Sequence, residues 1–152
     1  MHTLIEQRVE LNPNAPAICA WDGNLTYRHL DDLANRLAHY LVKTCEVTPD
    51  EIVALYFEKS IWTAVAMYAV LKAGAAYTLM GLTDPMARLE VVLQSTRSRV
   101  VVSSTIHSDK LSGKVPHLIT LCESFFKTIP EHNEAPRTSV NSGNLAYILF
   151  TS

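Results

Sequence analysis

The chain has 152 residues, of which 48% are hydrophobic and 18% are charged, and its formal net charge at pH 7 is −2. This composition excludes a disordered chain and fits one ordinary domain or a piece of a larger one. Charges of both signs are interspersed without a basic stripe, so no nucleic acid partner is expected. The three cysteines, Cys19, Cys45 and Cys122, are isolated, which is typical of reduced thiols in a cytoplasmic protein.

Two segments bear on targeting and membrane insertion. Charged side chains interrupt the first ten positions, so no signal peptide is expected. Residues 61–82 are apolar apart from a few hydroxyl groups, but Lys72 lies near their centre. A lysine there costs about 3 kcal/mol in a membrane-spanning helix. Because Gly74 is also a typical helix end, we expect two buried elements here and no membrane partner; a membrane span is the less favoured alternative.

The N-terminal part of the chain predicts a short helix followed by a hairpin. Residues 2–11 have the apolar spacing of a helix that ends at Asn12-Pro13. Residues 16–21 and 24–27 are predicted to be strands, and Asp22-Gly23 between them is typical of a tight turn.

The clearest helical pattern follows this hairpin. Leucines and alanines recur at steps of three and four residues and form one apolar stripe. The stripe consists of Leu30, Leu33, Ala34, Leu37, Ala38 and Leu41. Asp31 and Asp32 lie in the first turns, where the helix dipole favours carboxylates. Adjacent helical residues do not face each other, so we favour this interpretation over a catalytic carboxylate pair.

The rest of the chain alternates between predicted strands and helices. The five predicted strands are residues 52–57, 75–80, 99–103, 117–121 and 145–150. One helix is predicted from a cap at Ser60 to Ala73, and another begins with Asp84 as cap and Pro85 as first residue. Residues 122–143 are predicted to be an irregular polar loop. This order favours an α/β fold with a mainly parallel sheet and helices on both faces.

Sequence motifs for chemistry are scarce. His29 and His39 are ten residues apart on one helix and do not converge, and no histidine pair has metal-ligand spacing, so no metal site is expected. The sequence contains no G-x-S-x-G, no G-x-G-x-x-G and no complete P-loop. Taken alone, these residues indicate a scaffold without chemistry.

Three ordered blocks nevertheless resemble a known family. The first is L-T-Y-R-H-L at 25–30 with A-N-R-L-A at 34–38; the second is F-E-K-S-I-W at 57–62 with L-K-A-G-A-A-Y at 71–77; the third is L-A-Y-I-L-F-T-S at 145–152. Together they resemble the N-terminal part of adenylation domains of nonribosomal peptide synthetases, within the adenylate-forming (AMP-dependent synthetase) family. The second block is most similar to fungal modules.

The resemblance implies that residues 1–152 are an incomplete N-terminal subdomain of the adenylate-forming fold. Complete members use ATP and Mg²⁺ to activate an amino acid and pass it to the phosphopantetheine thiol of a carrier domain. Only Thr151 and Ser152 map onto that site, as the opening of the ATP-phosphate loop, and no catalytic residue does. We therefore expect this fragment to bind ATP poorly, to be inactive alone, and to self-associate through an exposed terminal strand. The alternatives are a non-catalytic scaffold or interaction module and an unrelated nucleotide-binding α/β domain.

The chain departs from the family pattern at two places. His29 stands where the family has glutamate, which removes the carboxylate of a capping box with Thr26 and weakens the helix start by up to about 1 kcal/mol. Residues 78–82 read T-L-M-G-L where the family has V-P-L-D-P, so two stiffening prolines and an aspartate are replaced. This fits either a tolerated loop variant or, by a small margin, relaxed constraint on a decayed gene.

Overall fold

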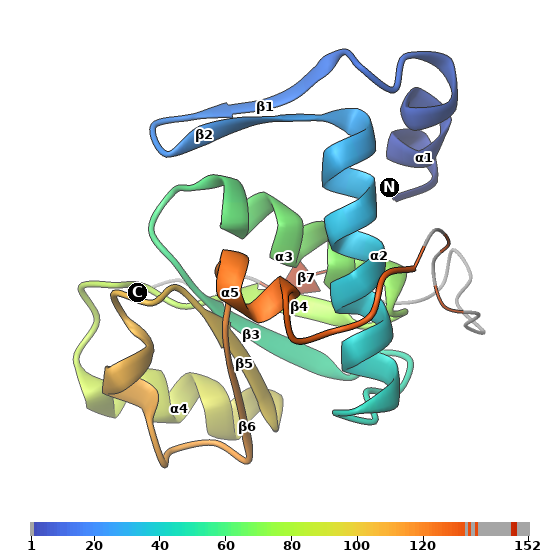
Figure 1. Cartoon of the computed structure of the whole chain (residues 1–152). Coiled ribbons are helices and arrows are strands. Elements are labelled where there is room, and N and C mark those ends of the chain that lie inside the picture. Colours follow the sequence, from blue (N-terminus) through green and yellow to red (C-terminus); the bar gives the residue numbers. More distant parts are fainter. Residues whose placement is uncertain (1, 133, 135, 137–146, 149–152) are drawn as a thin grey trace.

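The structure is a computed structural model that describes residues 2–132, 134, 136, 147 and 148 (Figure 1). Its elements in chain order are α1 (His2–Leu11), β1 (Pro16–Ala20), β2 (Gly23–Thr26), α2 (Tyr27–Lys43), β3 (Ile52–Tyr56), α3 (Ile61–Lys72), β4 (Ala76–Leu79), α4 (Met86–Thr96), β5 (Val100–Ser103), the 3-10 turn η1 (Ser108–Leu111), β6 (His117–Thr120), α5 (Glu123–Phe126) and β7 (Tyr147–Ile148). The alternation of strands and helices agrees with the sequence prediction.

The main sheet has five strands in the order β6-β5-β3-β4-β7, and every neighbouring pair is parallel. The strand β3 lies at its centre, with β4 on one side and β5 on the other. The strands β1 and β2 form a separate antiparallel hairpin beside the N-terminal end of α2 (Figure 1). The expected α/β class with a mainly parallel sheet is therefore confirmed.

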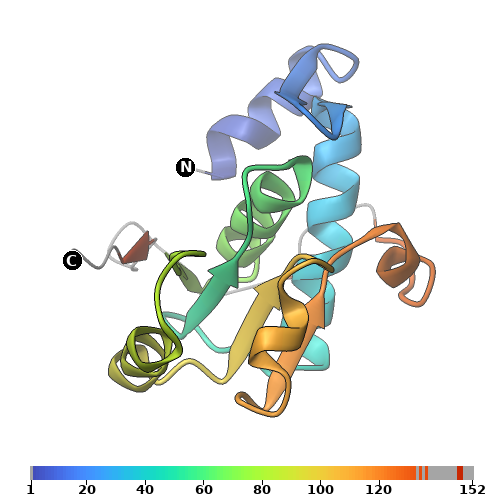
Figure 2. The same cartoon turned by 90° about the vertical axis from the view of Figure 1, so that its left-hand side faces the viewer.

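Helices cover both faces of the sheet (Figure 2), and the side chains of β3 alternate between these faces. Val53 and Leu55 belong to the core formed with α2 and α3, whereas Ala54 and Tyr56 belong to a second core formed with α4 and η1. The strand β5 repeats this alternation. Because both faces are buried, these strands are hydrophobic at almost every position.

The structure contains the expected caps Thr26 and Ser60 at the starts of α2 and α3, and the predicted end of α3 at Gly74. The Thr26 hydroxyl accepts a hydrogen bond from the His29 backbone N–H at 3.2 Å, and the Ser60 hydroxyl accepts one from the Thr63 N–H at 3.4 Å. Gly74 follows α3 with φ of 84°, a conformation that glycine adopts at low cost. The six residues of the predicted stripe on α2 are all buried.

The predicted cap of α4 is wrong. Pro85 occupies the N-cap position, the helix begins at Met86, and no side chain caps it. A Cβ atom at Gly81 would lie 2.6 Å from Asp84 Oδ2, so the Asp84 carboxyl group lies over the Gly81 backbone instead of the helix start. The absence of a side chain at Gly81 therefore leaves room for the Asp84 carboxyl group.

Two further expectations need correction. Tyr27, expected at the end of a strand, is the first residue of α2. The short helix α5 and the 3-10 turn η1 lie in segments without a helical prediction, because four-residue helices are too short to show a period. Within 122–143, residues 133, 135 and 137–143 lie outside the described part of the chain.

Of the predicted terminal strand, residues 145–150, only residues 147 and 148 belong to the described part of the chain. Tyr147 pairs with Tyr77 and Ile148 with Thr78, which places β7 at the edge of the sheet beside β4. The other residues of the predicted strand lie outside the described residues, and self-association through it remains a prediction. Among the described residues, no helix is both long and apolar enough to cross a membrane.

Candidate functional site

The carboxyl ends of the five parallel strands meet at one edge of the sheet. The order of the chain reverses at β3, since β4 lies on one side of it and β5 on the other. In open parallel sheets, ligands bind outside the carboxyl ends of the strands at such a reversal. The loops that follow β3, β4 and β5 therefore frame the first candidate site.

A carboxylate joins two of these loops. Glu58, after β3, accepts a hydrogen bond from the Ser104 hydroxyl, after β5, at 2.8 Å. His107 Nε2 lies 3.2 Å from the same carboxylate oxygen, and the His107 ring packs beside that of Tyr56. Because the serine donates to the carboxylate and not to the histidine, this is not a nucleophilic triad. Its geometry fits a clamp that holds the two loops together.

The end of β4 carries a buried hydroxyl group. Thr78 is fully buried, and its Oγ1 has no hydrogen-bond partner among the described residues. Burying an unpaired hydroxyl costs about 1–3 kcal/mol by mutational estimates. Thr78 is also the residue of β4 that pairs with Ile148 of β7 in the sheet.

The two site residues predicted from the sequence cannot be placed. Thr151 and Ser152 lie outside the described residues. The strand β7, which precedes them in the sequence, runs parallel to β4 and so points toward the edge formed by the carboxyl ends. Their assignment to a phosphate loop therefore remains a prediction.

A buried ionic cluster, which the sequence analysis did not find, links three helices. Lys72, on α3, has a side chain only 2% exposed, and its Nζ lies 2.8 Å from both Glu6 Oε1 on α1 and Asp31 Oδ1 on α2. Tyr68 donates to Asp31 at 3.0 Å, and burial followed by the charge of Asp31 raises the pKa of the Tyr68 phenol far above its usual range. Asp31 is therefore held by two side chains of α3.

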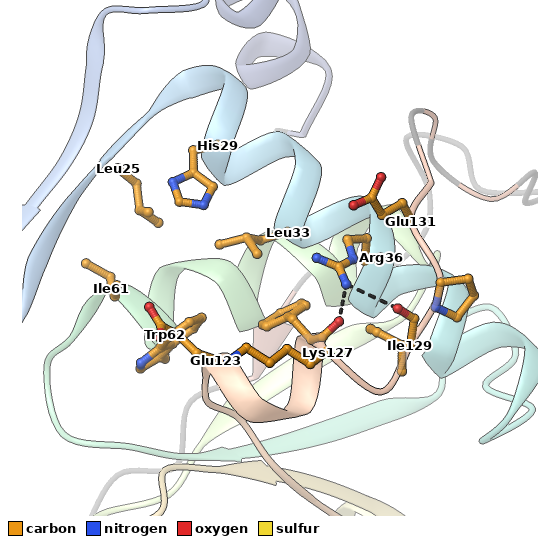
Figure 3. Close-up of a pocket in the computed structure, with 12 residues that line it drawn as sticks. Leu25, His29, Leu33, Arg36, Ile61, Trp62, Glu123, Lys127, Ile129 and Glu131 are labelled. Carbon is orange, nitrogen blue, oxygen red and sulfur yellow. Dashed lines mark hydrogen bonds between the residues drawn. The ribbon is translucent and has the colours of Figure 1, made fainter.

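A cavity of about 730 Å³ opens between α2, the start of α3 and α5 (Figure 3). Its walls are mostly apolar, with Leu33 of α2 facing Ile61 and Trp62 of α3. Arg36 lies on one side and donates to the backbone carbonyls of Phe126 and, at 3.1 Å, Ile129. The remaining lining residues are Leu25, His29, Glu123, Lys127, Pro130 and Glu131. The volume is in the range of small-molecule sites.

The buried cysteine is not an activated nucleophile. Burial raises the pKa of the Cys45 thiol to about 11, so the thiolate is scarce at neutral pH. Cys19 is exposed and Cys122 is partly buried, and all three are free thiols.

The architecture defines a class before any relative is considered. An open parallel sheet with helices on both faces, and with polar loops gathered at the carboxyl edge, is the scaffold of a protein that binds a ligand at that edge. Comparison with known sequences gives the family: the profile of the AMP-binding enzyme family matches residues 5–152. The chain belongs to this family.

The similar curated proteins are fungal nonribosomal peptide synthetases. The chain is 43% identical over 152 residues to nonribosomal peptide synthetase easA of Emericella nidulans and 40% identical over 152 residues to nonribosomal peptide synthetase GRA1 of Gibberella zeae. It is 38% identical over 152 residues to enniatin synthetase of Fusarium oxysporum. In all three the match covers 100% of this chain, but it covers only 2%, 2% and 5% of the relatives. The resemblance read from the three blocks is confirmed.

Solved structures confirm the fold. A fatty acyl CoA synthetase of Mycobacterium tuberculosis superposes with a TM-score of 0.86 at 20% identity, over 99% of this chain and 32% of that one. The nonribosomal peptide synthetase FmoA3 gives 0.88 at 24% identity, over 99% of this chain and 16% of that one. The N-terminal subdomain of Klebsiella oxytoca NpsA gives 0.81 at 21% identity, over 100% of this chain and 37% of that one.

The described residues at the carboxyl edge do not fit the triphosphate of ATP. They present the carboxylates Glu58 and Asp84 with a single neighbouring exposed lysine, Lys59, while Lys110 donates to the Asp84 carbonyl at 3.2 Å and His107 is paired with Glu58. The described part of the chain also contains no group of three His, Cys, Asp or Glu side chains that could hold a metal ion. We therefore assign no contact with ATP or Mg²⁺ to these residues.

Proposed function

We propose that the chain is the N-terminal portion of an amino-acid-activating adenylation domain of a nonribosomal peptide synthetase. The observation that carries this proposal is the match to the AMP-binding enzyme family over residues 5–152, together with 43% identity to a fungal synthetase over the whole chain. A complete domain of this kind forms an aminoacyl adenylate from ATP and an amino acid. It then transfers the acyl group to the phosphopantetheine of a carrier domain, in the cytoplasm.

In this proposal the described residues are scaffold and the chemistry lies elsewhere. Thr151 and Ser152 open the phosphate loop, and β7 directs the chain to the edge where β3, β4 and β5 also end. The carboxylate-rich loops at this edge support the proposal that the described residues do not bind the phosphates themselves. Stabilising a transferring adenylyl group requires preorganised donors, usually with Mg²⁺. The 152-residue polypeptide made alone is therefore proposed to be inactive.

A chimera tests the function. The 152 residues would replace the matching segment of the Emericella nidulans relative's adenylation domain, and pyrophosphate exchange would be measured with the amino acid that this domain activates. We expect exchange to persist in the chimera. Thr151→Val should lower it by about a hundredfold, the usual loss when one donor to a reacting centre is removed, whereas Thr151→Ser should retain most of it.

Two outcomes contradict the proposal. If the chimera folds, as judged by its circular dichroism and thermal unfolding, but shows no exchange, the chain is a non-catalytic scaffold or interaction module. If the isolated 152-residue polypeptide itself exchanges pyrophosphate with any amino acid, the proposed inactivity is wrong. The alternative of an unrelated nucleotide-binding domain no longer stands, because the family is established.

A further inference from the structure

The segment that forms one wall of the cavity is fastened to α2 by an unusual pair of side chains. We call residues 127–132, which follow α5, the strap; Lys127, Ile129, Pro130 and Glu131 of the strap all line the cavity. At its end, the ring of His132 stacks on that of His39 on α2, with a centroid separation of 3.6 Å and an angle of 14° between the ring planes. The strap therefore joins a histidine pair to the cavity.

The rest of the attachment depends on backbone carbonyls. Arg36 donates to the carbonyls of Phe126 and Ile129, and His39 Nε2 lies 2.9 Å from the carbonyl oxygen of Glu134. The Nε2–H tautomer of His39 is the one that donates to this carbonyl. Its Nδ1 is buried and has no partner among the described residues, so a proton added there would be buried without an acceptor.

We propose that the His39–His132 stack is a pH-sensitive fastener, which holds the strap in place as a wall of the cavity when the rings are neutral and releases it when both are protonated. Two imidazolium rings at 3.6 Å carry like charges face to face, whereas two neutral rings stack favourably. Release of the strap would open the cavity beside α5.

The surrounding charges support this device. Burial, followed by the positive charges of His39, Lys43 and Arg36, lowers the pKa of His132. Tyr40 faces the same end of α2, and because burial raises the pKa of its phenol, it stays neutral.

The acidic side chains around the strap are exposed. These are Asp32 on α2, Glu131 in the strap and Glu134 beyond it. Water and salt screen exposed charges. These carboxylates therefore offset the basic groups, which are Arg36, His39, Lys43 and His132, only in part.

The direction of the pH effect follows from the lowered pKa of His132. The unfolded chain binds a proton to His132 at a higher pH than the folded chain does, so the folded, strapped state is fully favoured above the unfolded histidine value of about 6.5. This preference is lost as the pH falls from there through the lowered folded value. The strap should therefore open under mildly acidic conditions.

Hydrogen exchange of the whole chain tests this proposal. After correction for the intrinsic pH dependence of exchange, the amides of residues 127–132 should exchange severalfold faster at about pH 5 than at about pH 7.5, the range over which histidine titrates. In His132→Phe, which keeps a stacked ring without a titratable group, this acceleration should disappear. His117→Asn, at the start of β6, is the matched control and should leave the acceleration unchanged.

His39→Gln provides a second variant in case His132→Phe folds poorly, since its amide can still donate to the Glu134 carbonyl. Circular dichroism at neutral pH confirms that each variant is folded before it is compared. The proposal is overturned if the wild-type strap exchanges equally at both pH values, or if a folded His132→Phe or His39→Gln retains the acceleration.

Discussion

The helix α2 helps to hold two peripheral segments, α1 and the strap, by different kinds of interaction. On one flank, Asp31 and Lys72 anchor α1 through Glu6 by attraction between unlike charges. On the other, Arg36 and the His39–His132 stack anchor the strap through carbonyl hydrogen bonds and ring packing. The first attachment is buried at its centre, where the Lys72 side chain is only 2% exposed. The second depends on histidines that must stay neutral, so it is the more easily reversed.

The two attachments also differ in how deeply their residues are buried. The Lys72 side chain has almost no contact with water, and a buried ammonium group is tolerated only when it is paired. The strap residues are largely exposed, so their attachment gains little from burial and depends on a few directed bonds. Replacing one member of each attachment should therefore have unequal effects.

The largest effect is expected at Lys72. Lys72→Met keeps an unbranched apolar side chain but leaves Asp31 partly buried without its cation, and should lower the free energy of unfolding by about 3 kcal/mol. Urea denaturation at neutral pH measures this change. Glu6→Gln is the control: the Glu6 side chain is 38% exposed, so its loss should cost less than about 1 kcal/mol. A Lys72→Met protein as stable as the wild type would show that the cluster adds nothing to stability.

A smaller effect is expected at Arg36. Arg36→Ala removes both hydrogen bonds to the carbonyls of Phe126 and Ile129, and should lower the free energy of unfolding by about 2 kcal/mol. Exchange of the strap amides should also rise at neutral pH, where the histidine stack is intact. Arg36→Lys keeps the charge but not the planar fork of donors, so its effect should be intermediate. Unchanged strap exchange in Arg36→Ala would leave the stack as the main attachment.

The smallest effect is expected at the start of the helix that carries both attachments. Thr26 already caps α2, and His29 occupies the third helical position, where glutamate would complete a capping box. His29→Glu should raise the free energy of unfolding by about 0.5 kcal/mol. His29→Gln, which offers an uncharged acceptor, should give a smaller gain in the same urea experiment. No gain in either variant would show that His29 costs the helix nothing.

Much of the fold could be predicted because its signals are local. The leucine stripe of α2, the Ser60 cap with Gly74 at the end of α3, and the uniformly hydrophobic strands each follow from a short repeat or a backbone preference. Sequence reasoning failed where the element was too short to show a repeating pattern, as in the four-residue helix α5, or where a side chain had two possible partners, as for Asp84. The three motif blocks indicated the family, which the local helix and strand patterns could not.

The site was less predictable than the fold. Glu58 and Ser104 each follow a predicted strand, so both could have been expected at the carboxyl edge, but only the strand order brings β3 beside β5. Thr151 and Ser152 came from the resemblance alone and lie outside the described residues.

The sequence by itself determined the class of fold, the course of the strands and helices, and membership of the AMP-binding enzyme family, because these depend on periodicity and on motifs of adjacent residues. Only the tertiary structure decided that Glu6 meets Lys72 and that His39 meets His132. Such contacts require distant segments to be brought together by the burial of their neighbours, and no short-range pattern encodes which partners then meet.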